Sequence, residues 1–395
     1  MKKLKLTDIA PYAGKRVQPF NGVKRYMSTG DLKGDNLSFE YVTFQNKPSR
    51  ADITVSEGDI LFAKMTNTNK ALLIDRSNDG LIISTGFSVH RPIENVLNAD
   101  YFLQFLKHDY FQRQKNKLCT GAIQSAISNT GIEKILVPVP DFSDQLHIAN
   151  LLTKAENLIS QRKGSIALLD EFLKSTFLEM FGDPVRNEKG WDKIQLQKIS
   201  EIQGGLQVTS KREINPIELP YLRVANVYRN FLDLSIIKTI KVTKEEAERA
   251  RLEKGDILIV EGHGNPNEIG RSSIWDGSIS YCLHQNHLIR VRVNYNFTVP
   301  IYVDYFINSP SGRQQMFKAG KTTSGLNTIS SKIVKETVIN LPPIELQTRF
   351  AQIVEKTEAL KTQYQQSLQE LENLYGSLSQ RAFKGQLGML KAIKT

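Results

Sequence analysis

The chain of 395 residues lacks the features that define several large classes of protein. It has two cysteines, Cys119 and Cys282, and no Cys-x-x-Cys pair, which excludes a disulfide framework and a zinc ribbon. No apolar run approaches the ~20 residues that span a bilayer, so we expect no membrane partner. The basic N-terminus reaches Asp8 before an apolar segment develops, which argues against a signal peptide. Together these absences predict a cytoplasmic protein.

Motifs of nucleotide-binding and catalytic sites are incomplete. Gly320-Lys321-Thr322 resembles the end of a P-loop, but Gln315 stands where that motif requires its first glycine. Gly262-His263-Gly264 is followed by Asn267 where a dinucleotide-binding motif has glycine. Asn340-Leu341-Pro342-Pro343 has Leu341 between the asparagine and the prolines, which the Asn-Pro-Pro-aromatic motif of amino-methyltransferases does not have. We therefore predict no catalytic residue and no cofactor-binding residue in this chain.

One concentration of metal-type ligands is present. It consists of His263, Cys282, His284 and His287. Their spacing matches no standard zinc module, and Cys282 and His284 fall in a predicted strand. A hydrogen-bonding strand edge is the preferred interpretation, so we predict no metal site.

Internal repetition is the strongest positive signal. Gly58-Asp59-Ile60-Leu61 recurs as Gly255-Asp256-Ile257-Leu258, at an offset of 197 residues. The offset is 190 near the start of each copy and stays at 202 from Ile127 to Phe181. A period of about 200 residues is too long for a solenoid, so each copy is a domain-sized unit.

Each copy changes its pattern once, from short strands to one long helix. The first part alternates short β-branched runs with Gly, Asn and Asp, as strands and turns do. In the second part apolar residues recur every seven positions, which indicates a seam for a partner helix. The seam residues are Leu152, Ile159, Ile166, Leu173 and Met180 in the first copy and Phe350, Thr357, Tyr364, Leu371 and Leu378 in the second. Each helix would be roughly 40 residues, or ~60 Å, long.

These patterns predict an α+β fold with internal duplication and pseudo-twofold symmetry. Two similar α/β domains are joined by two long helices, which we expect to pack as an antiparallel coiled coil. The alternative is that each helix lies on its own domain. The predicted segments are a first globular domain (1–140), a central long helix (141–182), a linker (183–190), a second globular domain (191–340), a distal long helix (341–385) and a C-terminal tail (386–395).

The positive charge lies on the globular domains. The chain has a net charge of +11, of which residues 1–140 carry +6 and residues 191–340 carry +5. Residues 141–182 carry −2 and residues 341–384 carry none. Two basic domains joined by helices without excess positive charge are typical of a protein that binds a polyanion at two places.

Several segments resemble the specificity subunit of Type I DNA restriction–modification enzymes. Residues 339–350, running on to 380–385, look like the distal repeat of that family, and residues 136–182 look like its central repeat. Residues 260–271 and 284–287 are similar to one variety of its target-recognition domains. The resemblance covers nearly the whole chain and is weaker in the first globular domain.

The resemblance implies a non-catalytic protein that binds double-stranded DNA. Each globular domain would be a target-recognition domain that reads half of a bipartite, asymmetric site. The helices would set the spacing and dock two methyltransferase subunits, which carry S-adenosylmethionine and methylate adenine. Restriction subunits, which use ATP and Mg²⁺ for translocation and cleavage, would join them.

Polar loops that follow the Gly-Asp-Ile-Leu strands are the preferred DNA-reading segments. In the first domain, Asn67 and Asn69 suit adenine edges, and Lys64 and Lys70 suit phosphates. In the second domain, the loop of residues 261–271 has glycines that allow close backbone approach. Its candidate residues are His263, Asn265, Asn267 and Arg271.

A second pair of segments is small, polar and flanked by lysine, which suits backbone contact. These are residues 121–125 and 321–327, and the further candidates are Lys117, Gln124 and Ser125, then Lys318, Lys321 and Asn327, and the basic pair Lys211 and Arg212. The alternative for any one of them is a solvated surface position.

Two other classes of function are compatible with parts of the sequence. The first is a stand-alone DNA methyltransferase or nuclease with degenerate motifs. The second is a coiled-coil scaffold with no role in nucleic-acid binding.

Overall fold

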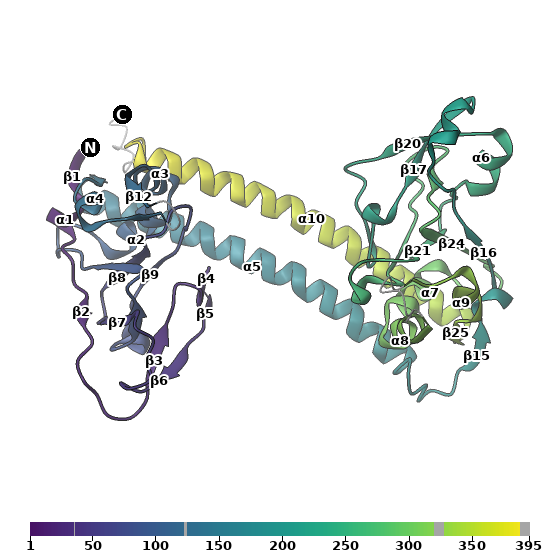
Figure 1. Cartoon of the computed structure of the whole chain (residues 1–395), viewed down its shortest axis with the longest axis horizontal. Coiled ribbons are helices and arrows are strands. Elements are labelled where there is room, and N and C mark those ends of the chain that lie inside the picture. The colour runs from purple at the N-terminus through teal and green to yellow at the C-terminus, as the bar shows by residue number, and fades with distance from the viewer. Residues whose placement is uncertain (35, 122–124, 320–327, 388–395) are drawn as a thin grey trace, which may run out of the picture. The chain divides into compact units, whose positions relative to one another are not determined.

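The structure is a computed structural model that describes residues 1–34, 36–121, 125–319 and 328–387. It divides into two compact units, Met1–Gly164 with the residues from Gln366 onward, and Ser165–Gln365. Each unit holds one globular domain of mixed helix and sheet, together with half of each long helix (Figure 1). The long helices are α5 (Phe142–Phe181) and α10 (Ile344–Phe383). The boundary between the compact units therefore falls near the middle of both helices, whereas the segments predicted from the sequence kept each helix whole.

The first unit begins with short strands and ends its globular domain with small helices. Its strands are β1 (Lys2–Lys5), β2 (Lys15–Arg16), β3 (Lys24–Met27), β4 (Leu32–Lys33), β5 (Asn36–Leu37), β6 (Glu40–Val42), β7 (Ala51–Thr54), β8 (Ile60–Ala63), β9 (Ala71–Leu73), β10 (Ile82–Ser84), β11 (Phe87–His90), β12 (Cys119–Thr120), β13 (Ala126–Ile127) and β14 (Leu136–Val139). Its short helices are α1 (Leu6–Ile9), α2 (Ala99–Lys107), α3 (Asp109–Leu118) and α4 (Asn129–Ile132).

The second unit has the same plan. Its strands are β15 (Asp192–Gln195), β16 (Ser200–Gly204), β17 (Ile217–Leu222), β18 (Val227–Tyr228), β19 (Phe231–Leu232), β20 (Lys238–Val242), β21 (Ile257–Val260), β22 (Ser272–Ile274), β23 (Leu283–His284), β24 (Leu288–Val293) and β25 (Val338–Leu341). Its short helices are α6 (Lys244–Ala250), α7 (Pro300–Asn308), α8 (Pro310–Ala319) and α9 (Ser331–Glu336). The helices α7–α9 gather near the ends of α5 and α10 together with β15 and β25, and β17 and β20 lie farther from them (Figure 1).

Each unit contains equivalent hydrogen bonds, and the residues that make them are related by offsets close to those found in the sequence. Strand β1 pairs antiparallel with β14 (Lys2 opposite Val139), and β15 pairs in the same way with β25 (Asp192 opposite Leu341). The hydroxyl of Tyr101 donates to the carbonyl of Pro138, and that of Tyr302 donates to the carbonyl of Asn340, both at 2.6 Å. These matching bonds confirm the internal duplication.

The repeated Gly-Asp-Ile-Leu segment builds the same turn and strand in each unit. Gly58 and Gly255 have φ of +85° and +97°, a conformation that favours glycine. The buried Asp59 carboxylate accepts a bond from Arg91 Nε, and Asp256 accepts one from Arg292 Nε, both at 2.8 Å. Strand β8 then lies between β11 and β9, and β21 lies between β24 and β22. The motif is therefore structural, and it starts a central strand whose far end leads into a candidate loop.

The two long helices contact each other within each unit. In the first unit the Tyr375 hydroxyl donates to Glu156 Oε1 at 3.1 Å, and Lys163 pairs with Glu372 at 2.8 Å. In the second unit Lys361 pairs with Asp170 at 2.5 Å, and Phe350 packs on Phe181 with ring centroids 5.4 Å apart. Residue numbers rise along α5 as they fall along α10, so the contacting stretches are antiparallel in each unit.

The ends of both helices also enter the core of each globular domain. Phe383 of α10 packs on Tyr101 and Phe105 of α2, with ring centroids 5.6 and 5.8 Å apart. In the second unit Phe181 of α5 packs on Tyr302 of α7, with ring centroids 4.8 Å apart. Burying one such aromatic side chain contributes about 1.5–3 kcal/mol. Each long helix therefore contacts the other helix and, at its C-terminal end, the globular domain of the other copy, whereas the alternative placed each helix on its own domain.

Candidate nucleic-acid interface

In the first unit, the structure brings the two predicted segments together. Residues 64–70 connect β8 to β9, and residues 121–125 precede β13. The Thr66 amide donates to the Ser125 carbonyl, and the Ile127 amide donates to the Lys64 carbonyl, both at 3.0 Å. Met65 and Ala126 form an isolated β-bridge. These bonds are made by backbone groups, so they hold the segments together without using the side chains of Thr66, Ser125 or Lys64.

The second unit repeats this arrangement. Residues 261–271 connect β21 to β22. The Ile329 amide donates to the Glu261 carbonyl at 2.8 Å, and Gly262 forms a bridge with Thr328. Lys64 and Glu261 are related by the offset of 197 and Ile127 and Ile329 by 202, so the bonds are equivalent. In each domain the loop that follows the Gly-Asp-Ile-Leu strand is therefore held by the same backbone contacts, made by different residues.

The candidate residues of the first unit differ in what they offer to a ligand. Asn67 is exposed with φ of +53°, and it exchanges hydrogen bonds with Asn116 at 3.0 Å. Lys117 is exposed at the end of α3, and Ser125 is partly exposed. Lys64 is half-buried, and burial lowers its pKa. Gln124 lies outside the described residues.

Asn69 and Lys70 mainly hold the loop in place. The Asn69 side chain donates to the Lys107 carbonyl at 2.8 Å and accepts from Gln112 at 3.1 Å. The Lys70 ammonium donates to the carbonyl of Thr29 at 2.5 Å. These bonds use the polar atoms that were expected to contact bases and phosphates, so both side chains position the loop.

In the second unit, Asn265 and Asn267 are the exposed candidates, and His263 is partly exposed. Asn265 Oδ1 accepts from the Asn267 amide at 3.1 Å and caps the turn Pro266–Glu268. Arg271 is buried, pairs with Glu268 at 3.1 Å and donates to the Val224 carbonyl at 3.0 Å. Arg271 thus anchors the end of the loop and does not face solvent.

The remaining candidates lie away from these contacts or outside the described part. Lys211 is exposed in the turn Ser210–Ile214. Arg212 pairs with Glu246 at 2.7 Å, and this hydrogen bond lowers the pKa of the Glu246 carboxyl. Lys318 belongs to α8, but its side chain is outside the described part, and Lys321 and Asn327 lie outside the described residues.

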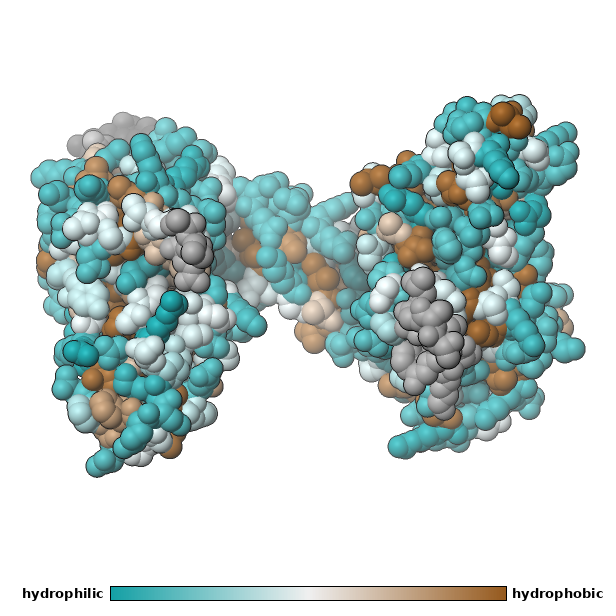
Figure 2. Space-filling view, in the orientation of Figure 1, coloured by the Kyte–Doolittle hydropathy of each residue, from teal (hydrophilic) through white to brown (hydrophobic). Residues whose placement is uncertain are grey.

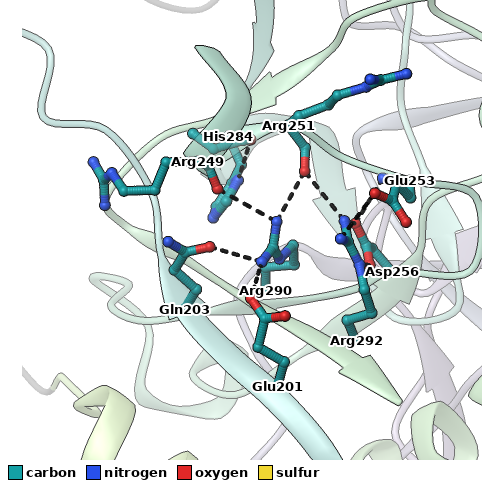
Figure 3. Close-up of polar contacts among 10 residues, drawn as sticks. Glu201, Gln203, Arg249, Arg251, Glu253, Asp256, His284, Arg290 and Arg292 are labelled. Atoms are coloured by element: carbon teal, nitrogen blue, oxygen red, sulfur yellow. Dashed lines mark hydrogen bonds and ion pairs between the residues drawn. The ribbon is translucent and has the colours of Figure 1, made fainter. Parts of the chain in front are cut away.

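His284, the buried histidine of the histidine and cysteine cluster, lies beside a network of hydrogen bonds made by two arginines (Figure 3). Nδ1 of the buried His284 donates to the Ala250 carbonyl at 3.0 Å, and burial lowers its pKa to about 4. Figure 3 shows the neighbouring Arg290 and Arg292 of β24, which both donate to the Arg251 carbonyl, at 2.9 and 3.3 Å. Arg290 also donates to Glu201 at 2.6 Å. Within the described ranges, no group of three or more His, Cys, Asp or Glu side chains could hold a metal ion.

The surface in Figure 2 is mainly hydrophilic over both units, and its apolar residues form small separate patches. No helix among the residues that the structure describes combines the length and apolarity needed to cross a membrane.

A buried lysine beneath the first loop was not predicted from the sequence. Lys115 of α3 is fully buried, and its ammonium donates to the carbonyls of Ala63 and Thr68, at 3.2 and 2.6 Å. Burial lowers its pKa to about 8. In the second domain Met316 takes this place, since Gln114 and Gln315, which precede the two residues, make equivalent bonds to β14 and β25. Lys115 therefore positions the loop that carries Asn67.

Replacing Lys115 with methionine tests this assignment. Above pH 8 the folded state has released the Lys115 proton, whereas the unfolded chain holds it up to about pH 10.4. The unfolding free energy of the wild type should therefore rise by about 1–2 kcal/mol relative to Lys115→Met between pH 7.5 and 9.5. Urea denaturation followed by circular dichroism measures this difference. Parallel pH profiles of the two proteins would contradict the assignment.

Comparison with known sequences extends these observations. The family model of the Type I restriction modification DNA specificity domain matches residues 1–170 and 188–373. The chain is 26% identical over 359 residues to the Type I restriction enzyme EcoKI specificity subunit of Escherichia coli, which covers 84% of this chain and 75% of that protein. It is 24% identical over 356 residues to the StySPI specificity subunit of Salmonella potsdam, with coverage of 84% and 75%.

Solved structures share the fold. One chain, described in connection with complex assembly and conformational transition of the type I R-M system, aligns with a TM-score of 0.60 and 21% identity over 98% of each chain. The S subunit of a Type I restriction–modification system from M. genitalium aligns with a TM-score of 0.58 and 14% identity, over 97% of this chain and 96% of that one. The solved structures share the fold, and the family model and the curated relatives show that the chain belongs to the Type I restriction modification DNA specificity family and is a specificity subunit with two DNA-recognition domains.

Proposed function

We propose that this chain is the non-catalytic subunit that selects the DNA site of a cytoplasmic Type I restriction–modification complex. Each domain reads one half of a bipartite, asymmetric site in double-stranded DNA. The long helices form an antiparallel coiled coil that sets the spacer and docks two methyltransferase subunits. Those subunits bind S-adenosylmethionine and methylate adenine, and the restriction subunits use ATP and Mg²⁺.

One observation carries this proposal: the loop after the Gly-Asp-Ile-Leu strand is held by the same backbone contacts in both domains but carries different side chains. The loop after β8 in the first unit carries Asn67, and the corresponding loop after β21 in the second carries His263, Asn265 and Asn267. Because the backbone contacts are the same, the loop lies at the same place on both domains. Because the side chains differ, the two domains prefer different bases. Two domains also provide the discrimination that one lacks, because each base pair contributes only ~1–3 kcal/mol.

Exposed apolar side chains on the long helices support docking of other subunits. Leu168 and Phe172 of α5 are both exposed and lie four residues apart, so they share one face of the helix. Large apolar residues clustered on an exposed helix face mark a protein-binding surface. This face is a candidate docking site for a methyltransferase subunit.

Methylome sequencing of cells with and without the gene tests the proposal. A methylated adenine motif with two defined halves should appear only when the gene is present. Methylation by the purified chain alone with S-adenosylmethionine would instead establish a stand-alone enzyme. Failure of the chain to bind duplex DNA at low salt, even with methyltransferase subunits, would favour a scaffold.

The lysines beside the loops should act through phosphates and not through bases. Lys117→Ala should weaken binding to all duplexes alike and reduce the salt slope by ~0.9 for each phosphate that the protein no longer neutralises. Lys318→Ala with Lys321→Ala should do the same for the second domain. Replacing Asn267 with alanine should instead relax one base position. Fluorescence anisotropy over a range of salt concentrations measures both effects.

Lys174→Ala on α5 is the matched control, because Lys174 is an exposed lysine on a helix of negative net charge. Its salt slope should equal that of the wild type. A changed motif with an unchanged salt slope in Lys117→Ala would reverse the assigned roles.

A further inference from the structure

A short hairpin occurs at the same place in both domains. Strands β4 and β5 pair Leu32 with Leu37, and β18 and β19 pair Val227 with Leu232. The turn before each hairpin is also equivalent, because the Ser28 amide donates to Asp31 Oδ2 at 2.8 Å and the Arg223 amide donates to Asn226 Oδ1 at 3.0 Å. The residues of the two hairpins are related by an offset of 195, although few of them are identical.

Each hairpin is fastened to the candidate loop of its own domain. The last residue of the first loop, Lys70, donates to the Thr29 carbonyl at 2.5 Å. The last residue of the second loop, Arg271, donates to the Val224 carbonyl at 3.0 Å. Thr29 and Val224 occupy the same position in the turn before the hairpin. A cation at the end of the loop therefore holds the hairpin beside the loop in both domains.

In the second domain further contacts join the hairpin and the loop. Arg229, in the hairpin turn, donates to the Asn267 carbonyl at 2.5 Å. The Arg271 guanidinium stacks over the Tyr228 ring, 4.7 Å from its centroid. The Asn230 amide donates to the Ser272 carbonyl at 2.9 Å. The hairpin and the loop of residues 261–271 thus form one continuous surface.

The second hairpin exposes aromatic side chains. Tyr228 is 42% exposed and Phe231 is 60% exposed, with ring centroids 6.2 Å apart. A pair of exposed aromatic rings on a domain surface marks a binding site. A two-stranded ribbon fits the DNA major groove, where apolar side chains contact the thymine methyl group. The surrounding domain is basic, which favours DNA as the occupant.

The first hairpin argues against a protein partner at this surface. It carries Lys33 and Asn36 where the second carries Tyr228 and Phe231. Two copies of one methyltransferase subunit would dock on similar surfaces of the two domains. Different half-sites, in contrast, would be read by different side chains. The dissimilar hairpins therefore fit DNA better than a subunit that binds twice.

From these contacts we infer that the hairpin Val227–Leu232 is a third DNA-reading element of the second domain, with Phe231 and Tyr228 in contact with base edges. This inference rests on the proposed function and adds residues to it. The first hairpin, with Lys33 and Asn36, holds the same place in the first domain.

Phe231→Ala in the complete methyltransferase complex tests the inference. Methylation rates are measured on duplexes that vary each base pair of the wild-type motif in turn. Discrimination at one position of the second half-site should fall by about five- to tenfold, and the first half-site should be read unchanged. Tyr295→Ala is the matched control, since Tyr295 is also 60% exposed but lies over Gly255, before β21 begins. It should keep the wild-type motif.

Phe231→p-benzoylphenylalanine provides a second readout that does not depend on rates. On irradiation of the complex with its DNA site, position 231 should crosslink to DNA. A crosslink to a methyltransferase subunit, or unchanged discrimination by Phe231→Ala, would overturn this inference and leave the proposed function unaffected. A wild-type complex that reads no bipartite site would contradict both the proposed function and this inference.

Discussion

Exchanging residues 191–340 for the second recognition domain of another specificity subunit should replace one half of the methylated motif and leave the other half unchanged. The two ends of the exchanged segment lie side by side, because Lys193 of β15 lies opposite Asn340 of β25. The candidate loops, their partner segment and the hairpin of the second domain all lie inside it. The half-site read by the second domain should therefore become that of the donor subunit.

The exchange must preserve the packing that joins this domain to the long helices. Tyr302 contacts Phe181 of α5, and Phe350 of α10 lies 5.4 Å from Phe181 between ring centroids. A donor domain with an aromatic residue in place of Tyr302 should fill this core. Loss of a buried aromatic costs about 3–5 kcal/mol, so a donor without it would fail through instability.

Methylome sequencing of cells that carry the exchanged gene gives the result directly. The reciprocal exchange of residues 1–140 is the control, and it should replace the other half of the motif. A wholly new motif, with neither half retained, would show that the domains do not read DNA independently.

The duplication made much of the fold predictable from the sequence. Offsets of 190 and 202 place Lys2 and Val139 in the positions of Asp192 and Leu341, and both pairs lie opposite each other in two-stranded sheets. The position of the loops was also predictable. A Gly-Asp turn followed by a buried apolar run indicates a central strand, and the next polar run must leave the sheet.

The roles of individual polar residues were less predictable, because they depend on which carbonyl groups lie nearby. Lys115 and Lys117 look alike in the sequence, yet the first is fully buried and the second is exposed. Likewise, Arg271 holds the loop, while Asn267 in the same loop is exposed. The hairpins escaped detection for another reason. Asp31 and Asn226 accept the same hydrogen bond through different side chains, so equivalent turns share few identical residues.

Lengthening both long helices by four residues should lengthen the spacer of the recognised site and leave both half-sites unchanged. Four residues add ~6 Å to a helix with little change in phase, since 3.6 residues make one turn. At ~3.4 Å per base pair, the preferred spacer should grow by one base pair, two at most. Suitable insertion points are near Arg162 in α5 and near Glu372 in α10, because Lys163 and Glu372 form an ion pair at 2.8 Å. Inserting in both helices keeps the antiparallel neighbours at equal length.

The seam must tolerate the insertion, because four extra residues shift the heptad phase locally. A variant in which four residues at the same place are substituted and none inserted is the control, and it should keep the wild-type spacer. Circular dichroism establishes that the longer helices are folded, and methylome sequencing reports the spacer. Because the reading loops are untouched, altered half-sites are not expected from a change in helix length alone. A folded insertion variant with an unchanged spacer would mean that the helices hold partner subunits without measuring DNA.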